Sequence, residues 1–539
     1  MSSGKKKSSD GGCLCCCDSD EEDSYDPYIP KPSPDSDKTK YETIRRLCLN
    51  TNTLYEDPDF RPDSSNLNSS GIVNGVLWKR PHQITPNPVY IHQGADYMDV
   101  DQGQYLGDCW FLTAVVCLAA SDERYLLNRV VPSDQDFYKD YCGAFRFRFW
   151  YRGRWVEVVV DDRLPTYNGR LIYGSNRSVP SEYWLPLLEK AYAKLYGGYQ
   201  DIHLGYVDVA LENLTGGVVE LAFFDRRLDH EKFNQGVLKF HKMNSFMSAF
   251  IKKEKNMSPQ EIELPTGLYA GHAYSIIDVI QVDTTNGLRT LLHVRNPWGF
   301  GEWNGPWSDG SPEWHTIIGP DRNRNFRVRD DGEFWMSLED FMGNFTGVAI
   351  AHLNSDEITT ALAANLHRTP WRMKELEGTR NYKGSSKGGH KHGGSPGKPP
   401  PKRSKAKGKR KWSNPQLELR LPEAKTPTYV VVSLVESNSR AVCEEHAPDP
   451  IFLKREKGKQ VHRIKPEHSC EIHPCCDESS GRAKPFVSRT AHFLMGPNDR
   501  VIVPCFIRPD TQAEFLFRVF CEEEVEITVV EDPIEVTEE

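Results

Sequence analysis

The sequence lacks any hydrophobic run long enough to cross a lipid bilayer, and it has no apolar segment near its start of the kind that directs secretion. Its first residues are polar, and Ser2 excludes N-myristoylation, which requires glycine at that position. Positive charge is not in excess either, since the net charge of −9 argues against a general nucleic-acid-binding protein. We therefore expect a cytoplasmic chain without a nucleic-acid partner, whose 14 cysteines remain thiols in a reducing compartment.

The overall composition is that of a folded protein. Of the 539 residues, 38% are hydrophobic and 27% are charged, which is typical of soluble globular domains. A chain of this length is sufficient for about two to four domains with cores of their own.

The first 40 residues have instead the composition of a disordered tail, rich in serine, aspartate, lysine and proline. Its cysteines follow Lys5–Lys7, an arrangement compatible with S-acylation and reversible membrane attachment. Zinc binding is a weaker alternative, because these thiols lack the two-residue separations of zinc sites. An unmodified tail is the third interpretation. The cysteines concerned are Cys13, Cys15, Cys16 and Cys17.

A second atypical segment, residues 383–411, is rich in lysine, glycine and proline and contains the run KRSKAKGKRK. Such a composition cannot bury a core, so we expect a mobile basic insertion. Its charge favours an anionic membrane surface, a nucleic-acid contact or a localisation signal, and a solvated loop is the plain alternative.

Hydrophobic periodicity predicts a mainly helical part up to about residue 206. The apolar run 109–120 contains no glycine or proline, and residues 181–196 have helical spacing and end at a Gly-Gly pair. Alternation over residues 145–161 predicts a β-hairpin within this part. A further helix is expected near residues 230–255, beyond the mainly helical part.

The chain then becomes rich in β-strand patterns. The pattern predicts strands at residues 271–280 and 289–295, with a turn signal at Asn286-Gly287 between them. Symmetric pairing about this turn would place Asn296 opposite roughly Ile276. Beyond Trp412, short alternating segments separated by turn residues are typical of an antiparallel β-sandwich.

The stretch Gln102–Leu112 places Cys109 where a loop enters a buried helix. A thiolate is stabilised by the positive end of a helix dipole, so this is a suitable position for a nucleophile. A core cysteine is the alternative. His272 and Asn296 would complete a thiol hydrolase, with histidine as the proton carrier and asparagine holding its tautomer, although each residue alone is weak evidence.

Three motifs in this order, Q-G-x-x-L-G-D-C-W, G-H-A-Y and N-P-W-G, resemble those of the calpain family of papain-like cysteine proteases. The resemblance extends to LLEKAYAK, DGEFWMS and WSNPQ and covers about residues 50 to 525. It implies an α+β protein with a two-lobed papain-like core followed by an antiparallel β-sandwich. The implied parts are a tail at 1–40, a helical lobe with the cysteine at 41–206, a β-rich lobe with the histidine and asparagine at 207–353, a β-sandwich at 354–530 that includes the basic insertion, and an acidic end at 531–539.

The same resemblance implies a calcium-regulated intracellular cysteine endopeptidase that performs limited cleavage of protein substrates through an acyl-enzyme. In the family, the oxyanion glutamine usually lies six residues before the cysteine, where this chain has Gly103. We favour Gln102, which keeps the Gln-Gly pair, and Gln104 remains open. A calcium-dependent membrane scaffold with little proteolytic activity is the main alternative, and a papain-like transferase or deubiquitinating enzyme is another.

Two calcium sites are implied by the resemblance, one in each lobe, and oxygen-rich donor sets suit this ion. Surface carboxylates without a metal are the alternative. The first site maps to the carbonyls of His92 and Gly94 and the carboxylates of Asp99 and Glu182. The second maps to Glu302, Asp309, Asp331 and Glu333, with Arg329 through its carbonyl.

Other motifs are weaker. The segment that starts at Asp321 fails as an EF-hand loop because its sixth residue is Phe326. The sequence shows no EF-hand domain after the sandwich, so we expect no small EF-hand subunit. The G-x-S-x-G match at 393–397 lacks the flanking strand and helix of a serine hydrolase, and the segment 470–476 is a poor zinc candidate.

Overall fold

The structure is a computed structural model in which most of residues 40–353 and the strands of the C-terminal part are described. Within the first range the exceptions are 70, 72–73, 122–123, 225–229, 254–260 and 321–330. Beyond it the described residues are 372–380, 410–411, 416–422, 424, 428–436, 452–455, 461–464, 468–469, 489–496, 500–504, 513–530 and 535–536. The cysteine-rich tail, most of the basic segment, the cluster at 470–476 and Arg329 lie outside the described residues.

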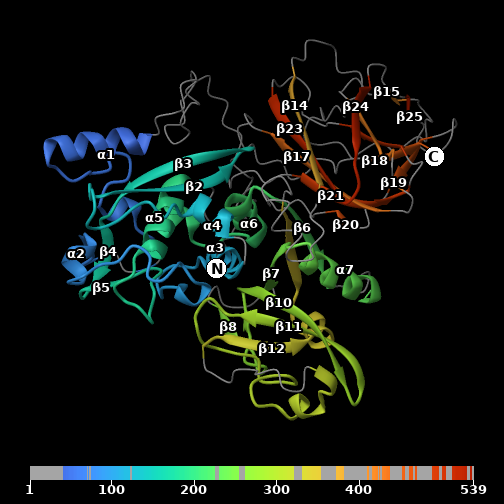
Figure 1. Ribbon diagram of the computed structural model, residues 1–539, viewed down its shortest axis with the longest axis horizontal. Helices are drawn as coiled ribbons and strands as arrows, with labels where there is room; N and C mark the ends of the chain where they lie inside the picture. The colour runs from blue at the N-terminus through green and yellow to red at the C-terminus, as the bar shows by residue number, and fades with distance from the viewer. Residues whose placement is uncertain are drawn as a thin grey trace, which may run out of the picture. The chain divides into compact units, whose positions relative to one another are not determined.

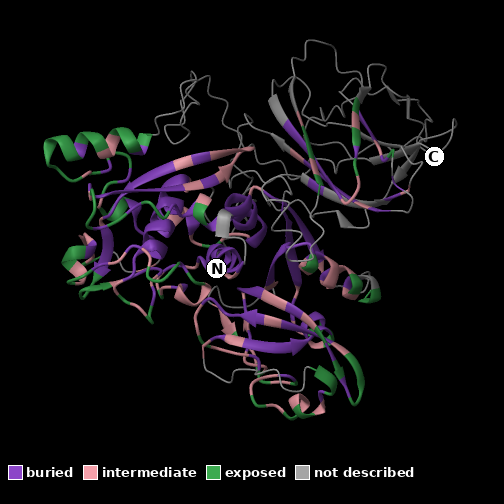
Figure 2. Ribbon diagram, in the orientation of Figure 1, coloured by how far each residue is buried: buried purple, intermediate pink, exposed green. Residues whose placement is uncertain are grey.

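Helices dominate the part of the chain before residue 216 (Figure 1). Helix α3 spans Cys109–Ala120, as predicted, and apolar residues on all its sides bury it almost completely (Figure 2). Helix α5 spans Trp184–Tyr196 and stops where Gly197 adopts a left-handed conformation with φ of 114°. The other helices here are α1 (Lys40–Thr51), α2 (Pro81–Ile84), α4 (Arg124–Val130) and α6 (Val207–Thr215).

The predicted hairpin is confirmed. Strands β2 (Ala144–Tyr151) and β3 (Arg154–Asp161) pair antiparallel around Arg152 and Gly153, whose φ angles of 51° and 79° fit a tight hairpin turn. A separate three-stranded sheet is formed by β1 (Leu77–Lys79), β4 (Leu164–Tyr167) and β5 (Arg170–Leu171).

A six-stranded antiparallel sheet in the order β12-β11-β10-β7-β13-β6 forms the centre of the following part. Helix α7 covers only His230–Lys242, so the prediction of a helix to residue 255 is wrong. Asn244, with a left-handed φ of 61°, helps to end the helix, and β7 enters the sheet between β10 and β13. The remaining elements are β6 (Val218–Phe223), β7 (Phe246–Ile251), β8 (Ile262–Glu263), β9 (Tyr269–Ala270), β10 (His272–Thr284), β11 (Gly287–Arg295), β12 (Glu333–Ser337), α8 (Leu338–Asn344) and β13 (Gly347–His352).

The hairpin of β10 and β11 has a different register from the expected one. Ile276 pairs with Val294, whereas symmetric pairing would have placed it opposite Asn296. An irregularity between Ile276 and Asp278 inserts an extra residue into β10, and the shift moves the end of β11 toward the start of β10, where His272 lies.

Ten of the described C-terminal strands form two five-stranded antiparallel sheets, in the orders β14-β23-β17-β21-β20 and β19-β18-β22-β16-β24, and β15 pairs with β25. The mixture of helices and sheets confirms the predicted α+β class. None of the helices in the described residues is both long and apolar enough to span a bilayer. The strands are β14 (Arg372–Arg380), β15 (Arg410–Lys411), β16 (Gln416–Arg420), β17 (Thr428–Glu436), β18 (Phe452–Arg455), β19 (Val461–Ile464), β20 (His468–Ser469), β21 (Arg489–Met495), β22 (Arg500–Pro504), β23 (Ala513–Cys521), β24 (Glu526–Val530) and β25 (Glu535–Val536).

Candidate active site

Cys109 is the first residue of α3, and its side chain is buried where α3 packs against β10. Burial raises the pKa of its thiol well above the usual value, and the negative charge of Glu261 adds to this effect. The helix N-terminus acts in the opposite direction by favouring the thiolate. In the arrangement described here, Cys109 is therefore held as a thiol.

His272 begins β10, and its imidazole is fixed by Asn296, the residue that follows β11. The two buried side chains are joined by a 2.8 Å hydrogen bond between His272 Nε2 and Asn296 Oδ1. Asn296 Nδ2 donates to Gly301 O at 3.0 Å, and its Oδ1 also accepts from Trp298 N at 3.1 Å. These partners assign Asn296 Oδ1 as an acceptor, so His272 Nε2 carries the hydrogen.

Aromatic rings surround this hydrogen bond. The ring centroid of Trp298 lies 4.5 Å from that of His272, with an interplanar angle of 43°. Tyr269 packs edge-on against Trp298, also at 4.5 Å between centroids. Apolar surroundings of this kind strengthen a hydrogen bond, because water does not compete for its partners.

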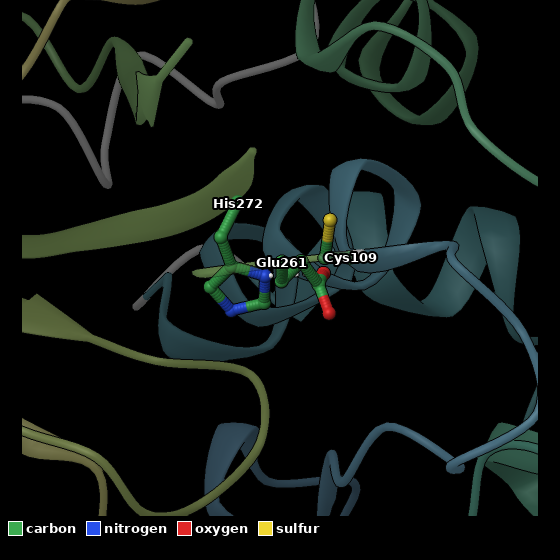
Figure 3. A group of neighbouring side chains, drawn as sticks. All are labelled: Cys109, Glu261 and His272. Carbon is green, nitrogen blue, oxygen red and sulfur yellow. Dashed lines mark hydrogen bonds and ion pairs between the residues drawn. The ribbon is translucent and has the colours of Figure 1, made fainter. Parts of the chain in front are cut away.

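The sequence motifs gave no indication of Glu261, which lies just before β8. Its Oε1 is 2.9 Å from His272 Nδ1, the imidazole nitrogen on the opposite side from Asn296. Donor atoms of Cys109, Glu261 and His272 all lie within 4.8 Å of one another. Figure 3 shows the three side chains converging from separate segments of the chain. No local pattern at residue 261 marks this position, so only tertiary structure reveals it.

Gln102 and Gln104, the two candidates for an oxyanion glutamine, differ in burial. Gln102 is buried, and its Nε2 donates to Leu106 O at 2.8 Å, whereas Gln104 is exposed. A Cβ at Gly103 would lie 2.5 Å from backbone atoms of Tyr173, so this position accepts no side chain. The arrangement favours Gln102, which is already inside the protein on the loop that precedes Cys109.

Two of the residues predicted for the first calcium site, His92 and Asp99, lie close to a third, Glu182. Its Oε1 accepts from His92 N at 2.5 Å, and the amide of Asn176 bridges its Oε2 and Asp99 Oδ1 at 2.7 and 2.9 Å. Burial raises the pKa of Glu182 to about 7 and also raises that of Asp99. Gly94 follows on the exposed turn after His92. Two neighbouring desolvated carboxylates fit a divalent cation with oxygen ligands.

The second predicted site is only partly assembled. Glu302 Oε1 accepts from the backbone N–H groups of Asp331 and Gly332 at 3.0 and 2.9 Å. Burial raises the pKa of Glu302 to about 7, and the charges of Asp309 and Asp331 contribute to the shift. These three carboxylates therefore belong to one electrostatic group, which suits a divalent cation.

The carboxylate of Glu333, the fourth one predicted for the second site, has other partners in the described structure. It lies 3.2 Å from His293 Nε2 and 3.5 Å from Arg295 Nη1. Burial opposes ionisation, but these partners lower the pKa of Glu333 below its usual value. Its backbone N–H donates to Asp331 Oδ1 at 3.2 Å, so Glu333 lies beside the second group, and its role as a calcium ligand stays a prediction.

Comparison with known proteins identifies the family of this chain. Residues 55–352 match the calpain family cysteine proteases. The chain belongs to this family. It is 35% identical to Calpain clp-1 of Caenorhabditis elegans over 517 residues, which cover 91% of this chain and 61% of that protein. The family resemblance of the sequence motifs is thereby confirmed.

Mammalian calpains are similar to the chain to nearly the same degree. Human Calpain-9 is 33% identical over 498 residues, covering 89% of this chain and 67% of that protein. The human Calpain-2 catalytic subunit is 31% identical over 529 residues, covering 92% and 69%. The chain spans about 60% of the length of the first relatives, at 61% of Calpain clp-1 and 58% of Drosophila melanogaster Calpain-A.

Proposed function

We propose that this calpain-family protein is a calcium-dependent cysteine endopeptidase that cleaves protein substrates at limited positions. The observation that carries this proposal is the buried hydrogen bond from His272 to Asn296 beside Cys109. Three side chains with the roles of a thiol protease come from three separate segments and meet at one place.

The chemistry follows from the positions of the protons. Cys109 transfers its thiol proton to His272 Nδ1 and attacks the peptide carbonyl, forming a tetrahedral intermediate. Asn296 Oδ1 accepts the hydrogen bond from His272 Nε2–H throughout, which keeps Nδ1 on the side of the thiol. The imidazolium then protonates the leaving amine. In the second step, His272 Nδ1 takes a proton from the water that attacks the thioester and gives it to the sulfur of Cys109 as the acid leaves.

An oxyanion develops on the substrate carbonyl oxygen during both steps. The backbone N–H of Cys109 and the side-chain amide of Gln102 are the donors that we assign to it. Glu261 must leave His272 Nδ1 for this chemistry, because that nitrogen receives the thiol proton. The described arrangement therefore corresponds to a resting state of the enzyme.

Calcium is assigned to the two carboxylate groups because each brings oxygen donors together around one partly buried glutamate: Glu182 shares the amide of Asn176 with Asp99, and Glu302 is held by the backbone of Asp331 and Gly332. Asp99 and Glu182, with the carbonyls of His92 and Gly94, would hold one ion; Glu302, Asp309 and Asp331 would hold the other. When bound, the ions supply positive charge that neutralises each group and stabilises the loops carrying it.

The C-terminal sheets belong to the same proposal. Buried apolar residues from both sheets, among them Leu417, Leu419, Val430 and Phe517, form one cluster and support an antiparallel β-sandwich. We also propose a cytoplasmic protein that associates reversibly with anionic membranes through its cysteine-rich tail and basic segment.

The test compares the protein with Cys109→Ala and with Cys117→Ala, a buried cysteine of the same helix, as the matched control. Each is incubated with casein in the presence of Ca²⁺ or excess chelator, and the fragments are analysed. Cleavage should require Ca²⁺, disappear in Cys109→Ala and persist in Cys117→Ala. Full cleavage in chelator would refute the calcium assignment, and Ca²⁺-dependent membrane binding without any cleavage would support the scaffold alternative.

A further inference from the structure

The nucleophile and its histidine lie beside a carboxylate that peptide hydrolysis does not require. We propose that Cys109, Glu261 and His272 form a binding site for Zn²⁺, and that the bound ion reversibly blocks the active site. The donor atoms of the three side chains lie within 4.8 Å of one another. In a tetrahedral zinc complex, bonds of about 2.0 to 2.3 Å place the ligand atoms roughly 3 to 4 Å apart, so only small side-chain movements are needed.

The chemistry of the donors selects zinc over calcium. Thiolate sulfur, imidazole nitrogen and carboxylate oxygen are the ligands that zinc takes in proteins, whereas calcium takes oxygen alone. Three protein ligands leave a fourth position for water. The two groups of carboxylates assigned to calcium contain no sulfur donor, so the ions would occupy different places.

The surroundings of His272 already hold the imidazole as a metal ligand requires. Its Nε2–H donates to Asn296 Oδ1 at 2.8 Å, and Asn296 is itself fixed by Gly301 O at 3.0 Å. This bond leaves Nδ1 on the side of Cys109 and Glu261, where it lies 2.9 Å from Glu261 Oε1; a bound ion would replace this contact and bridge the two groups. Histidine ligands of metals are commonly oriented in this way by a hydrogen bond to the other ring nitrogen.

Burial and charge also favour an ion at this position. Cys109 is 7% and His272 is 2% exposed, so a bound ion would be largely shielded from water. A divalent cation would compensate the charge of Glu261 and displace the thiol proton of Cys109, which is released to solvent. The ion would then occupy both the sulfur and the nitrogen that peptide cleavage uses. Metal binding does not depend on the proposed function, but the inhibition rests on it.

The experiment measures protection of one cysteine by zinc, because the 14 thiols of the chain make total zinc binding difficult to assign. The full chain, without Ca²⁺, is titrated with ZnCl₂ and labelled with iodoacetamide, and the labelled fraction of Cys109 is determined by peptide mass spectrometry. The variants are Glu261→Gln and, as the matched control, Glu263→Gln, an exposed acidic residue of β8. Thermal unfolding of each variant shows that it is folded.

Zinc should protect Cys109 in the wild type and in Glu263→Gln at the same concentration. Glu261→Gln should require at least about tenfold more zinc, since losing even an outer-shell partner of a metal ligand costs roughly 10- to 100-fold in affinity. No protection, or equal protection in Glu261→Gln, would overturn the proposal. Casein cleavage in Ca²⁺ should fall with the same zinc dependence. Protection of Cys109 in a protein that never cleaves casein would leave the metal site intact and refute the protease function instead.

Discussion

Replacing Asn296 by alanine tests the most buried part of the proposed mechanism. The substitution removes the acceptor that lies 2.8 Å from His272 Nε2, between side chains that are 0% and 2% exposed. During catalysis the imidazole becomes charged, and a hydrogen bond to a charged group contributes about 1.5 to 3 kcal/mol. At about 1.4 kcal/mol per factor of ten, kcat/KM should fall roughly 10- to 150-fold.

The loss should appear mainly in kcat, because the bond strengthens only when the imidazolium forms. The assay is the Ca²⁺-dependent hydrolysis of a fluorogenic peptide, with thermal unfolding measured in parallel. The thermal-unfolding measurement shows whether the variant is still folded. It is needed because Asn296 also bonds Trp298 N and Gly301 O, and each lost partner of a buried group costs about 1 to 3 kcal/mol of stability.

Asn304→Ala is the matched control. Its amide donates to Pro265 O at 3.1 Å in an exposed position, so activity should change less than about twofold. If folded Asn296→Ala retained at least half of the wild-type kcat/KM, the assigned role of this asparagine would be refuted.

Three further predictions concern the scaffold around the site. Lys190 is fully buried, and its Nζ is ion-paired with Asp161 Oδ1 at 2.6 Å. Lys190→Met leaves that carboxylate without this partner and should lower the free energy of unfolding by about 3 to 5 kcal/mol in denaturant titrations. A loss below about 1 kcal/mol would contradict this prediction. Burial lowers the pKa of His203, so the unfolded chain binds its proton more readily. The free energy of unfolding should therefore fall as pH drops below about 6.5, by at most about 1.4 kcal/mol per pH unit. His203→Gln should make this pH dependence less steep, and an unchanged pH dependence would refute the role of His203. A Cβ at Gly205 would lie 2.3 Å from the ring of Trp110, so Gly205→Ala should reduce kcat/KM about 10- to 100-fold by displacing the start of α3, whereas Gly343→Ala, with nothing within 4 Å, should not.

The sequence by itself determined the features that depend on short stretches of chain. Helix α3 was predictable because residues 109–120 are apolar except for Thr113 and contain no helix breaker. The β2–β3 hairpin followed from alternation around Arg152-Gly153. The family, and with it the triad candidates, followed from linear motifs. All of these signals are local, because periodicity, turn residues and motifs are properties of neighbouring residues.

Local patterns misjudged the elements whose state depends on packing. Residues 246–251 form β7 in the middle of a sheet although they continued a helical prediction, because tertiary pairing outweighs intrinsic propensity. The partners of Glu333 also come from tertiary pairing, since the pairing of β12 with β11 places its carboxylate beside His293 and Arg295.

Only the tertiary structure decided how the active site is completed. The irregularity in β10 shifts the hairpin register, and Asn296 reaches His272 with its side chain. Glu261 joins Cys109 and His272 from a segment with no motif of its own. The distance between such side chains is set by the packing of α3 against β10 and by strand register, and these are properties of the whole fold that no short stretch of sequence contains.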